Sequence, residues 1–396
     1  MTFLKSYFRK LQEILKEKSI LHFVLLIVSV AYLSRYNVWV VKYLGILFVS
    51  TFIFQSLFLL KKSYGFYIFR VLIFFLICFE LIGIYGGRNV PEIKVVWNPE
   101  EIRGLTKDTV LGFKNTSNVQ VEHILLENKD TLFRTKYTTD SLGRRISDLS
   151  IINDLDSFEN VNNKHAVFLG GSYTFGFGIP YSSTFPFLYT EMKPGYVSYN
   201  YGVSGFSTHQ IPLLFDDGIN IINNDAVPEE DGFALYTFID AHLSRVFGSG
   251  NYFSWAPCST PDVYIENGVL VKKRFPVWKL LFFNFLNESK GVRSFNIVYT
   301  YPRTEEYYKR FAEIINYTAR KYWEMKPRGN FYVGLFPGRT WDQTWIKYLD
   351  PRIKVLDIPQ PVDYEERKSE YLIKESHHPD ILLNTYYIEN VIQLIE

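Results

Sequence analysis

Five short apolar runs follow residue 160, and they constrain the fold more than any other feature of the sequence. They are residues 166–169, 197–201, 233–239, 331–336 and 353–358. Runs of this length between turn residues are typical of strands buried on both faces. Most of the intervening segments are long enough for a crossover helix, which favours a parallel sheet covered by helices on both sides. We therefore expect an α/β domain with three layers, α/β/α, over residues 161–396, with an insertion at about residues 245–300.

Three apolar stretches dominate the first 88 residues. They are residues 20–33, 38–60 and 64–85. The last two are long enough to cross a bilayer, whereas the first reaches that length only with its flanks. Arg70 and Glu80 lie within the third stretch and leave a transport role open. However, Arg70 is near the end of its stretch, where its side chain can reach the interface, so we interpret the segment as an anchor.

The charges around these stretches indicate how many of them cross the membrane. One basic cluster precedes the first stretch, and Lys61 and Lys62 separate the second from the third. An odd number of spans places both clusters on the cytoplasmic side. We therefore expect about three transmembrane helices in residues 1–88, in the cytoplasmic (inner) membrane. A multi-pass anchor of this kind would place the remaining chain outside the cytoplasm, in the periplasm of a bacterium with two membranes.

Two further regions carry hairpin patterns. Residues 119–126 and 131–138 alternate between apolar and polar side chains, which predicts a hairpin within a small β-rich connecting region at 89–160. Residues 263–271 contain Asn267-Gly268 between two alternating runs, a strong hairpin signal. Residues 276–286 are apolar and aromatic. They could touch the bilayer surface, line an acyl pocket or pack as core.

Composition excludes several classes of function. The chain of 396 residues has 43 basic and 41 acidic side chains, a net charge of +2, which gives no reason to expect nucleic acid as a partner. Its two cysteines, Cys78 and Cys258, lie in different parts of the chain, so we expect no intrachain disulfide. No Cys and His spacing indicates a metal, and no glycine pattern indicates a nucleotide cofactor. We therefore expect neither, and the oligomeric state cannot be predicted.

The chemistry is concentrated where the first strand ends. Gly170-Gly171-Ser172 follows the apolar run 166–169, which indicates a buried strand that presents a serine on a tight loop. Glycine permits a close approach of the backbone, and a serine hydroxyl becomes a nucleophile when a base removes its proton. A glycine-rich turn between a strand and a helix is the alternative interpretation.

A candidate base lies near the C-terminus. Glu375 precedes His378 by three residues, and Pro379 follows before a segment of periodic apolar residues at 381–395. An acid at this spacing can hold one imidazole tautomer and stabilise the imidazolium cation. The neighbouring His377 offers a second imidazole, and a solvated helix cap is the alternative for the whole group.

Together these segments resemble the SGNH hydrolase superfamily, also called GDSL-type, in a membrane-anchored bacterial form. Ser172 matches the serine block, although Gly171 stands where the family often has Asp. The second block is matched by residues 200–208, with Gly205 as the glycine of the oxyanion hole. His378 and Pro379 match the last block, with Glu375 in place of the usual Asp. The resemblance implies a flavodoxin-like domain in which Ser172, His378 and Glu375 are catalytic.

The third block departs from the family pattern. The strand at 233–239 runs into Asp240-Ala241-His242, whereas the family has an Asn that donates to the oxyanion. An ionised Asp240 could not donate, but His242 could do so through a ring N–H. The resemblance therefore implies an oxyanion hole made by Ser172, Gly205 and His242. Residues 139–145, with Arg144 and Arg145, resemble a stretch upstream of the serine block in some members, and we interpret it as a solvated turn.

The function that the resemblance implies is a membrane-anchored, extracytoplasmic serine esterase. It would remove ester-linked acyl groups, O-acetyl above all, from a glycan or lipid of the cell envelope. Two alternatives stay open. The same chemistry could transfer the acyl group to an exported polysaccharide, or the domain could bind envelope carbohydrate without catalysis, since its third block lacks the asparagine.

Overall fold

The structure is a computed structural model. It describes residues 93–100, 104–127, 129–147, 163–215, 221–253, 260–289, 302–337, 342–374 and 378–396, with Leu76, Ala256, Val292 and Ser376. The three apolar stretches expected to cross a bilayer lie outside these residues, apart from Leu76. Where residues are described, no helix is both long enough and apolar enough to cross a membrane.

The chain divides into two compact units. One comprises residues 1–88 and 289–297, and the other, unit 2, comprises residues 89–288 and 298–396. Unit 2 thus contains the predicted connecting region and the predicted catalytic domain, apart from residues 289–297 of its insertion.

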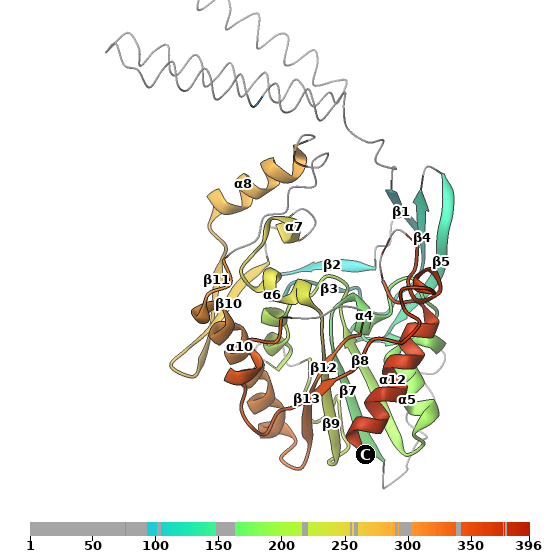
Figure 1. The fold of residues 1–396 in the computed structure, drawn as a ribbon, viewed down its shortest axis with the longest axis vertical. Helices are drawn as coiled ribbons and strands as arrows, with labels where there is room; N and C mark the ends of the chain where they lie inside the picture. Colours follow the sequence, from blue (N-terminus) through green and yellow to red (C-terminus); the bar gives the residue numbers. More distant parts are fainter. Residues whose placement is uncertain are drawn as a thin grey trace, which may run out of the picture. The chain divides into compact units, whose positions relative to one another are not determined.

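A five-stranded parallel sheet forms the centre of unit 2 (Figure 1). Its strands are β7 (Lys164–Gly170), β8 (Tyr196–Gly202), β9 (Gly232–Phe238), β12 (Asn330–Leu335) and β13 (Lys354–Asp357). Their order is β13-β12-β9-β7-β8, so β7 lies between β8 and β9, with Leu169 opposite both Tyr201 and Tyr236. All five strands predicted from the apolar runs are confirmed, and so is their parallel arrangement.

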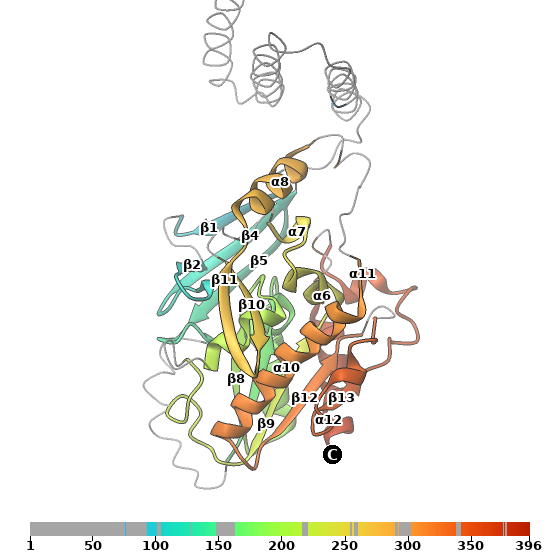
Figure 2. The ribbon, with the colours of Figure 1, turned by 90° about the vertical axis from the view of Figure 1, so that its left-hand side faces the viewer.

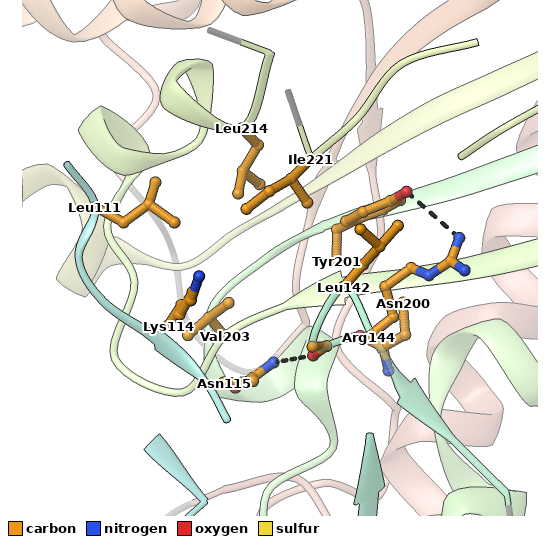
Figure 3. Close-up of a pocket in the computed structure, with 11 residues that line it drawn as sticks. Leu111, Lys114, Asn115, Leu142, Arg144, Asn200, Tyr201, Val203, Leu214 and Ile221 are labelled. Carbon is orange, nitrogen blue, oxygen red and sulfur yellow. Dashed lines mark hydrogen bonds between the residues drawn. The ribbon is translucent and has the colours of Figure 1, made fainter. Parts of the chain in front are cut away.

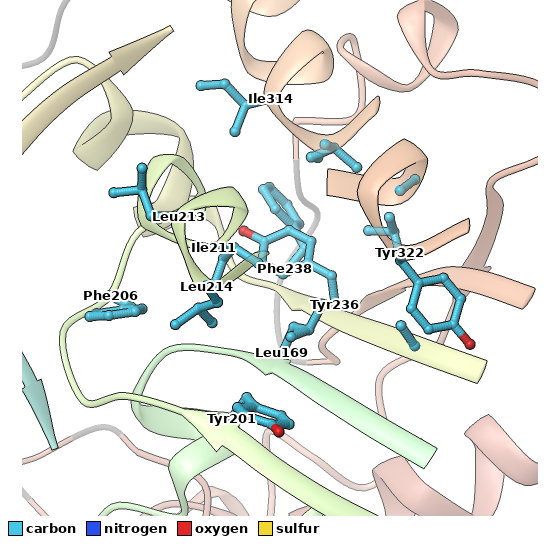
Figure 4. Packing of buried hydrophobic residues seen from close by; sticks show 14 of the residues in the cluster. Leu169, Tyr201, Phe206, Ile211, Leu213, Leu214, Tyr236, Phe238, Ile314 and Tyr322 are labelled. Carbon is cyan, nitrogen blue, oxygen red and sulfur yellow. The ribbon is translucent and has the colours of Figure 1, made fainter. Parts of the chain in front are cut away.

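Helices cover both faces of this sheet, and the alternation of side chains along β7 shows how. Val167 and Leu169 pack on the side of α10 (Glu305–Met325), together with η4 (Thr208–Gln210) and η5 (Pro212–Phe215). Ala166 and Phe168 pack on the opposite side, against α5 (Phe185–Met192) and α12 (Ile381–Ile395). Figure 4 shows Leu169, Tyr236 and Phe238 of the strands packed toward Ile314 of α10. The expected α/β/α layers are therefore present.

The two long helices begin at capping residues. The Thr304 side chain accepts a hydrogen bond from the Tyr307 N–H at the start of α10, and the Asp380 side chain accepts one from the Ile381 N–H at the start of α12. Such caps satisfy donors that have no partner within the helix. Shorter helical segments are α4 (Ser172–Phe175), η3 (Tyr181–Ser183), η6 (Ile346–Tyr348) and α11 (Lys368–Tyr371).

The connecting region forms an antiparallel sheet of its own. Its order is β1 (Ile93–Asn98), β4 (Gln120–Glu127), β5 (Asp130–Thr139) and β6 (Arg145–Ile146), and β2 (Leu105–Asp108) pairs with β3 (Gly112–Asn115) beside it. Pairing of β4 with β5 confirms the hairpin predicted here.

Side-chain amides attach this region to the end of β8. The Asn115 side-chain N–H group donates to the carbonyl oxygens of Gly143 at 2.9 Å and of Gly202 at 3.0 Å, and Figure 3 shows the first of these bonds. Arg144 forms an ion pair with Asp140 and also donates to the Ala226 carbonyl. The connecting region is therefore bonded to the sheet edge where the second sequence block begins.

The insertion contains the second predicted hairpin. After α6 (Asp240–Val246) and α7 (Gly250–Phe253), β10 (Pro261–Glu266) pairs with β11 (Val269–Arg274), and α8 (Val277–Glu288) follows (Figure 2). Asn267 and Gly268 have φ of 52° and 78°, the two positive values that a tight hairpin turn requires. The Asn-Gly prediction is therefore confirmed.

Candidate active site

Ser172 lies at the carboxyl end of the central strand. It is the first residue of α4, directly after β7 and Gly171, and its residue surface is 7% exposed. A Cβ at Gly170 would lie 2.3 Å from the Thr174 hydroxyl oxygen, so only glycine permits this sharp entry into the helix. Within the described residues the Ser172 N–H donates to no acceptor, as expected for the first turn of a helix.

His378 reaches Ser172 from the other end of the chain. Its Nε2 lies 2.8 Å from the Ser172 hydroxyl oxygen, across 206 residues of sequence. Its Nδ1 lies 3.0 Å from the Ser376 carbonyl oxygen. Because a carbonyl oxygen only accepts, Nδ1 carries the ring proton, and Nε2 is free to accept the proton of the Ser172 hydroxyl. The structure thus brings together the predicted nucleophile and the predicted base.

The segment that carries His378 is held by backbone hydrogen bonds. The Ile373 N–H donates to the His378 carbonyl at 2.8 Å, and Leu372 forms an isolated antiparallel bridge with Pro379. This small loop fixes the imidazole before α12 begins. Glu375 and His377, the predicted acid and the competing imidazole, lie outside the described residues.

Two aromatic rings flank the His378 imidazole. The Phe177 ring centroid lies 4.4 Å from that of His378, and the Tyr173 ring centroid lies 5.4 Å away. Both come from the segment that begins with Ser172, and both are half-buried. They limit the rotation of the imidazole and shield its bond to Ser172 from water. Both residues lie within five positions of Ser172 in the sequence, but their residue types alone do not mark them as neighbours of the base.

Gly205 lies on the loop after β8, and its neighbours Val203 and Phe206 approach the two glycines that precede Ser172. The Val203 N–H donates to the Gly170 carbonyl at 3.2 Å, which attaches this loop to the end of β7. Gly205 has φ of +91°, in the left-handed region that favours glycine. Among the described residues no acceptor receives the Gly205 N–H. The Gly205 N–H is therefore a backbone donor on a loop that is bonded to the end of β7.

His242 occupies the place of the missing asparagine. Its Nδ1 lies 2.7 Å from the Tyr236 hydroxyl oxygen, which in turn lies 2.6 Å from the Thr208 hydroxyl oxygen. The residue is 1% exposed, and its Nε2 has no hydrogen-bond partner in the described part of the chain. A buried polar atom without a partner is costly and is commonly found at a functional site.

Gly171 explains how His242 approaches the serine. A Cβ at Gly171 would lie 3.1 Å from His242 Nε2 and 3.3 Å from the Phe206 carbonyl oxygen. A longer side chain would therefore collide with the imidazole or displace it. The glycine at position 171 therefore lets the His242 imidazole lie where it does, because a side chain at 171 would require the ring to move.

The electrostatics of this corner keep His242 neutral. Burial, followed by the positive charge of Arg245, holds the pKa of His242 well below its usual value. Arg245 also donates to the Phe206 carbonyl at 3.0 Å. Asp240, by contrast, forms an ion pair with Arg303 at 2.8 Å, and each side chain is about one third exposed. Of the two polar residues in the third block, His242 therefore lies by the serine, and Asp240 binds a surface arginine.

Arg145 was predicted to lie in a solvated turn, and this prediction is wrong. The residue is 1% exposed. Its guanidinium group donates to the carbonyl oxygens of Phe175 at 3.0 Å and Ile179 at 2.6 Å, and also to that of Gly176. It also lies over the Tyr137 ring, 4.6 Å from the centroid. Burial lowers its pKa to about 10, so it stays charged at neutral pH.

Through these bonds, side chains of the connecting region support the backbone of the site. Arg145 and Tyr137 come from the antiparallel sheet, and the Tyr137 hydroxyl accepts a hydrogen bond from the Gly178 N–H at 2.9 Å. The Thr135 hydroxyl donates to the Ile179 carbonyl at 2.9 Å. The backbone that follows Ser172 is therefore held by side chains from another sheet. Sequence reasoning could not find this, because backbone acceptors leave no pattern of residue types.

Where residues are described, no three His, Cys, Asp or Glu side chains are grouped so that they could hold a metal ion. The polar groups that converge on Ser172 are instead one imidazole that accepts a proton and several N–H donors, a set suited to acyl transfer.

Comparison with known proteins gives distant likenesses. The sequence matches no protein-family model and no curated protein. Among solved structures, the chain is similar to an acetyl xylan esterase of the rumen bacterium Butyrivibrio proteoclasticus, with 10% identity, 59% of this chain and 63% of that chain covered, and a TM-score of 0.35. It is also similar to a lipolytic protein of the G-D-S-L family from Veillonella parvula, with 12% identity, coverage of 58% and 97%, and a TM-score of 0.31. A third is a carbohydrate esterase family 2 enzyme of Corynascus thermopiles, with 11% identity, coverage of 78% and 88%, and a TM-score of 0.34.

Proposed function

We propose that this chain is a serine esterase whose nucleophile is Ser172. The single observation that carries the proposal is the hydrogen bond of 2.8 Å between the Ser172 hydroxyl and His378 Nε2, with the opposite ring nitrogen held by the Ser376 carbonyl. A base in hydrogen-bond contact with the hydroxyl, itself oriented by a third group, is the arrangement that activates a serine.

The proposed reaction has two halves. Ser172 Oγ attacks the ester carbonyl as His378 Nε2 takes its proton, and the carbonyl oxygen becomes an oxyanion. His378 then returns the proton to the alcohol as it leaves, which completes the acyl-enzyme. Water attacks this ester in the second half, again with His378 as the base, and the acid leaves while Ser172 regains its proton.

We assign the oxyanion hole to three donors: the N–H groups of Ser172 and Gly205, and the Nε2–H group of His242. Tyr236 sets the tautomer. Its hydroxyl contacts both the Thr208 hydroxyl and His242 Nδ1. We assign the Tyr236 hydroxyl as the donor to Nδ1, which puts the single proton of the neutral imidazole on Nε2. Burial raises the pKa of Tyr236 and keeps this hydroxyl protonated. A preorganised donor of this kind is worth about 10² to 10³ in kcat.

We further propose that the enzyme is anchored in the cytoplasmic membrane, acts outside the cytoplasm, and removes O-acetyl or other acyl esters from an envelope glycan or lipid. The apolar stretches of residues 1–88 and the position of Lys61 and Lys62 between two of them support this topology. A reporter fused after Glu396 should be active only outside the cytoplasm. Reporter activity in the cytoplasm would contradict three transmembrane spans and would indicate two.

An acetate-release assay tests the activity. Purified full-length chain, incubated with an O-acetylated polysaccharide or with p-nitrophenyl acetate, should release acetate, and Ser172→Ala should abolish the release. Ser182→Ala is the matched control, because Ser182 is exposed and lies outside the proposed machinery. Wild type that is folded but inactive would favour a binding module. Acetate that appears on an added glycan acceptor instead of in solution would identify an acyltransferase.

A further inference from the structure

Helix α8 carries apolar side chains on two opposite faces. On its inner face Leu280, Phe283 and Leu286 pack against the cluster that contains Phe253 and Phe275. Lys279, the one cation of the helix, donates to the Phe247 carbonyl and so is turned toward the domain. A helix with a single apolar face buries that face against one partner, whereas α8 has further apolar residues that the domain does not cover.

The outer face of α8 consists of Val277, Trp278, Leu281 and Phe282. These residues are 69%, 68%, 65% and 51% exposed, respectively. Single exposed apolar residues are common on protein surfaces, but four neighbours on one helix form a contiguous patch, and such patches mark contacts with a protein or a membrane. Trp278 is informative, because its ring combines a large apolar surface with one polar N–H, the property that places tryptophan at membrane interfaces.

A basic cleft adjoins this face. Its volume is about 470 Å³, and it is lined by Lys107 and Asp108 of β2 and by three cations of β11, Lys272, Lys273 and Arg274. Arg274 precedes Val277 by only three residues, so the cations lead directly into the outer face of α8. Asp108 forms an ion pair with Lys114 at 3.2 Å, which leaves the cleft with an excess of positive charge.

We propose that the outer face of α8 and the basic cleft dock unit 2 on the surface of an anionic lipid bilayer. Trp278, Leu281 and Phe282 enter the boundary between headgroups and acyl chains, and the cations of the cleft bind lipid phosphates. Apolar burial and electrostatic attraction to anionic lipids act together in such contacts.

The length of the connection to the apolar stretches favours lipid as the occupant. Only seven residues lie between Tyr85 and Ile93, where β1 begins, and the eight Cα-to-Cα steps of an extended chain between them span about 28 Å. Figures 1 and 2 place α8 at the same end of unit 2 as β1. If residues 64–85 cross a bilayer, α8 is held within reach of its surface. A second copy of the chain fits less well, because a symmetric contact here brings two sets of like charges together.

The test places a nitroxide spin label on the outer face. In the full chain with Cys78→Ser and Cys258→Ser, Leu281→Cys carries the label, and the chain is reconstituted in bilayer discs of phosphatidylcholine with or without phosphatidylglycerol. In the anionic discs the label should be accessible to oxygen and protected from a water-soluble nickel complex. Val362→Cys, at a fully exposed residue elsewhere in unit 2, is the matched control and should stay accessible to nickel in both discs.

Charge reversal completes the test. Lys272→Glu, Lys273→Glu and Arg274→Glu together should restore nickel access at position 281 and leave acetate release from p-nitrophenyl acetate unchanged. A label that stays aqueous in anionic discs overturns the proposal. A label that is shielded from both oxygen and nickel in either lipid also overturns it, because the outer face is then covered by protein. Spin–spin broadening between labels overturns it as well, because the face then contacts a second copy of the chain. The readout does not depend on ester chemistry, so its failure is distinct from failure of the proposed activity.

Discussion

At the scale of single residues, the tautomer and orientation of the His378 ring follow from its two hydrogen-bond partners. The Ser376 carbonyl takes the Nδ1 proton, which leaves the Nε2 lone pair directed at Ser172. A backbone acceptor thus does part of what a carboxylate does in other serine enzymes, because it fixes the tautomer and the ring orientation. It does not supply the negative charge that stabilises an imidazolium cation, and this difference can be measured.

The first prediction ranks three substitutions near the C-terminus. His378→Ala should lower kcat by about 10³ or more, because a serine without its base is a weak nucleophile. Glu375→Gln should cost less, since the Ser376 carbonyl still orients the ring, and His377→Ala should cost least. Steady-state kinetics on p-nitrophenyl acetate measure the order. If His377→Ala is the most damaging, the last block has been assigned one residue out of register.

The second prediction concerns the replacement for the asparagine. His242→Ala should lower kcat by about 10² to 10³ with little change in KM, because the lost donor acts on the charge that develops in the transition state. Tyr236→Phe should give a smaller loss, since it removes only the group that fixes the tautomer. His209→Ala, at another buried imidazole, is the matched control for a loss of stability. Wild-type kcat in His242→Ala would remove this residue from the oxyanion hole.

At the scale of elements, the antiparallel sheet acts on the catalytic loop through Arg145. Its guanidinium group donates to three carbonyl groups in the segment that follows Ser172. The sheet is therefore part of the active site in a structural sense, although it lies before the serine block in sequence. The loop and its support must form together for Ser172 to lie where His378 can reach it.

The third prediction tests this support. Arg145→Met should lower the free energy of unfolding by at least about 3 kcal/mol, because several buried carbonyl groups lose their donor. At a temperature where the variant is folded, its kcat should fall while KM changes little. Arg145→Lys keeps the charge but reaches fewer acceptors, so its free energy of unfolding should lie between those of Arg145→Met and wild type. Arg134→Met, at an exposed ion pair, should change stability by less than about 1 kcal/mol. Equal effects at the two arginines would contradict this role.

The elements that could be predicted are those whose patterns are local. The five strands of the parallel sheet are short apolar runs, and Asn267-Gly268 specifies its own turn, so each is visible within ten residues of sequence. Strand β1 was not singled out, because it becomes a strand by pairing with β4, some thirty residues later. Arg145 was misassigned for a related reason. Two adjacent arginines indicate solvent unless the distant carbonyl acceptors are known.

The site shows the same limit. Ser172, Gly205 and His378 carry residue types and spacings that indicate their chemistry, and the structure places all three at one corner of the sheet. Whether His242 can donate depends on its hydrogen bond to Tyr236, which lies six residues earlier in the sequence, on β9. Phe177 and Tyr173 are aromatic residues in an aromatic-rich chain, so nothing in the sequence marked them as neighbours of the base.

At the scale of the whole molecule, buried neutral histidines make the fold sensitive to acid. Burial lowers the pKa of His123 and of His165 to about 4 and that of His209 to about 3, from an ordinary value of 6.5. Between those values the unfolded chain binds protons that the folded chain does not. The free energy of unfolding therefore falls as the pH falls from about 6.5 toward 4.

The fourth prediction gives this effect a size. Each of these histidines lowers the free energy of unfolding by up to about 1.4 kcal/mol for each pH unit of acidification in that window. The midpoint temperature of thermal unfolding should therefore drop steeply between pH 6.5 and 4.5 and change little between pH 7 and 8. His123→Phe removes one of four buried imidazoles with a lowered pKa, His242 being the fourth, and should make the dependence shallower by about one quarter. Thermal unfolding at each pH measures it. A midpoint that is constant from pH 7 to pH 5 would show that these imidazoles are not buried as neutral groups.

The central claim is that His378 activates Ser172, and labelling with a fluorophosphonate probe tests it without knowledge of the substrate. Wild type should be labelled, and mass spectrometry should find the adduct on Ser172. Ser182→Ala should be labelled like wild type, His378→Ala slowly, and folded Ser172→Ala not at all. A folded wild-type chain that resists the probe, or an adduct that persists in Ser172→Ala, would contradict the account.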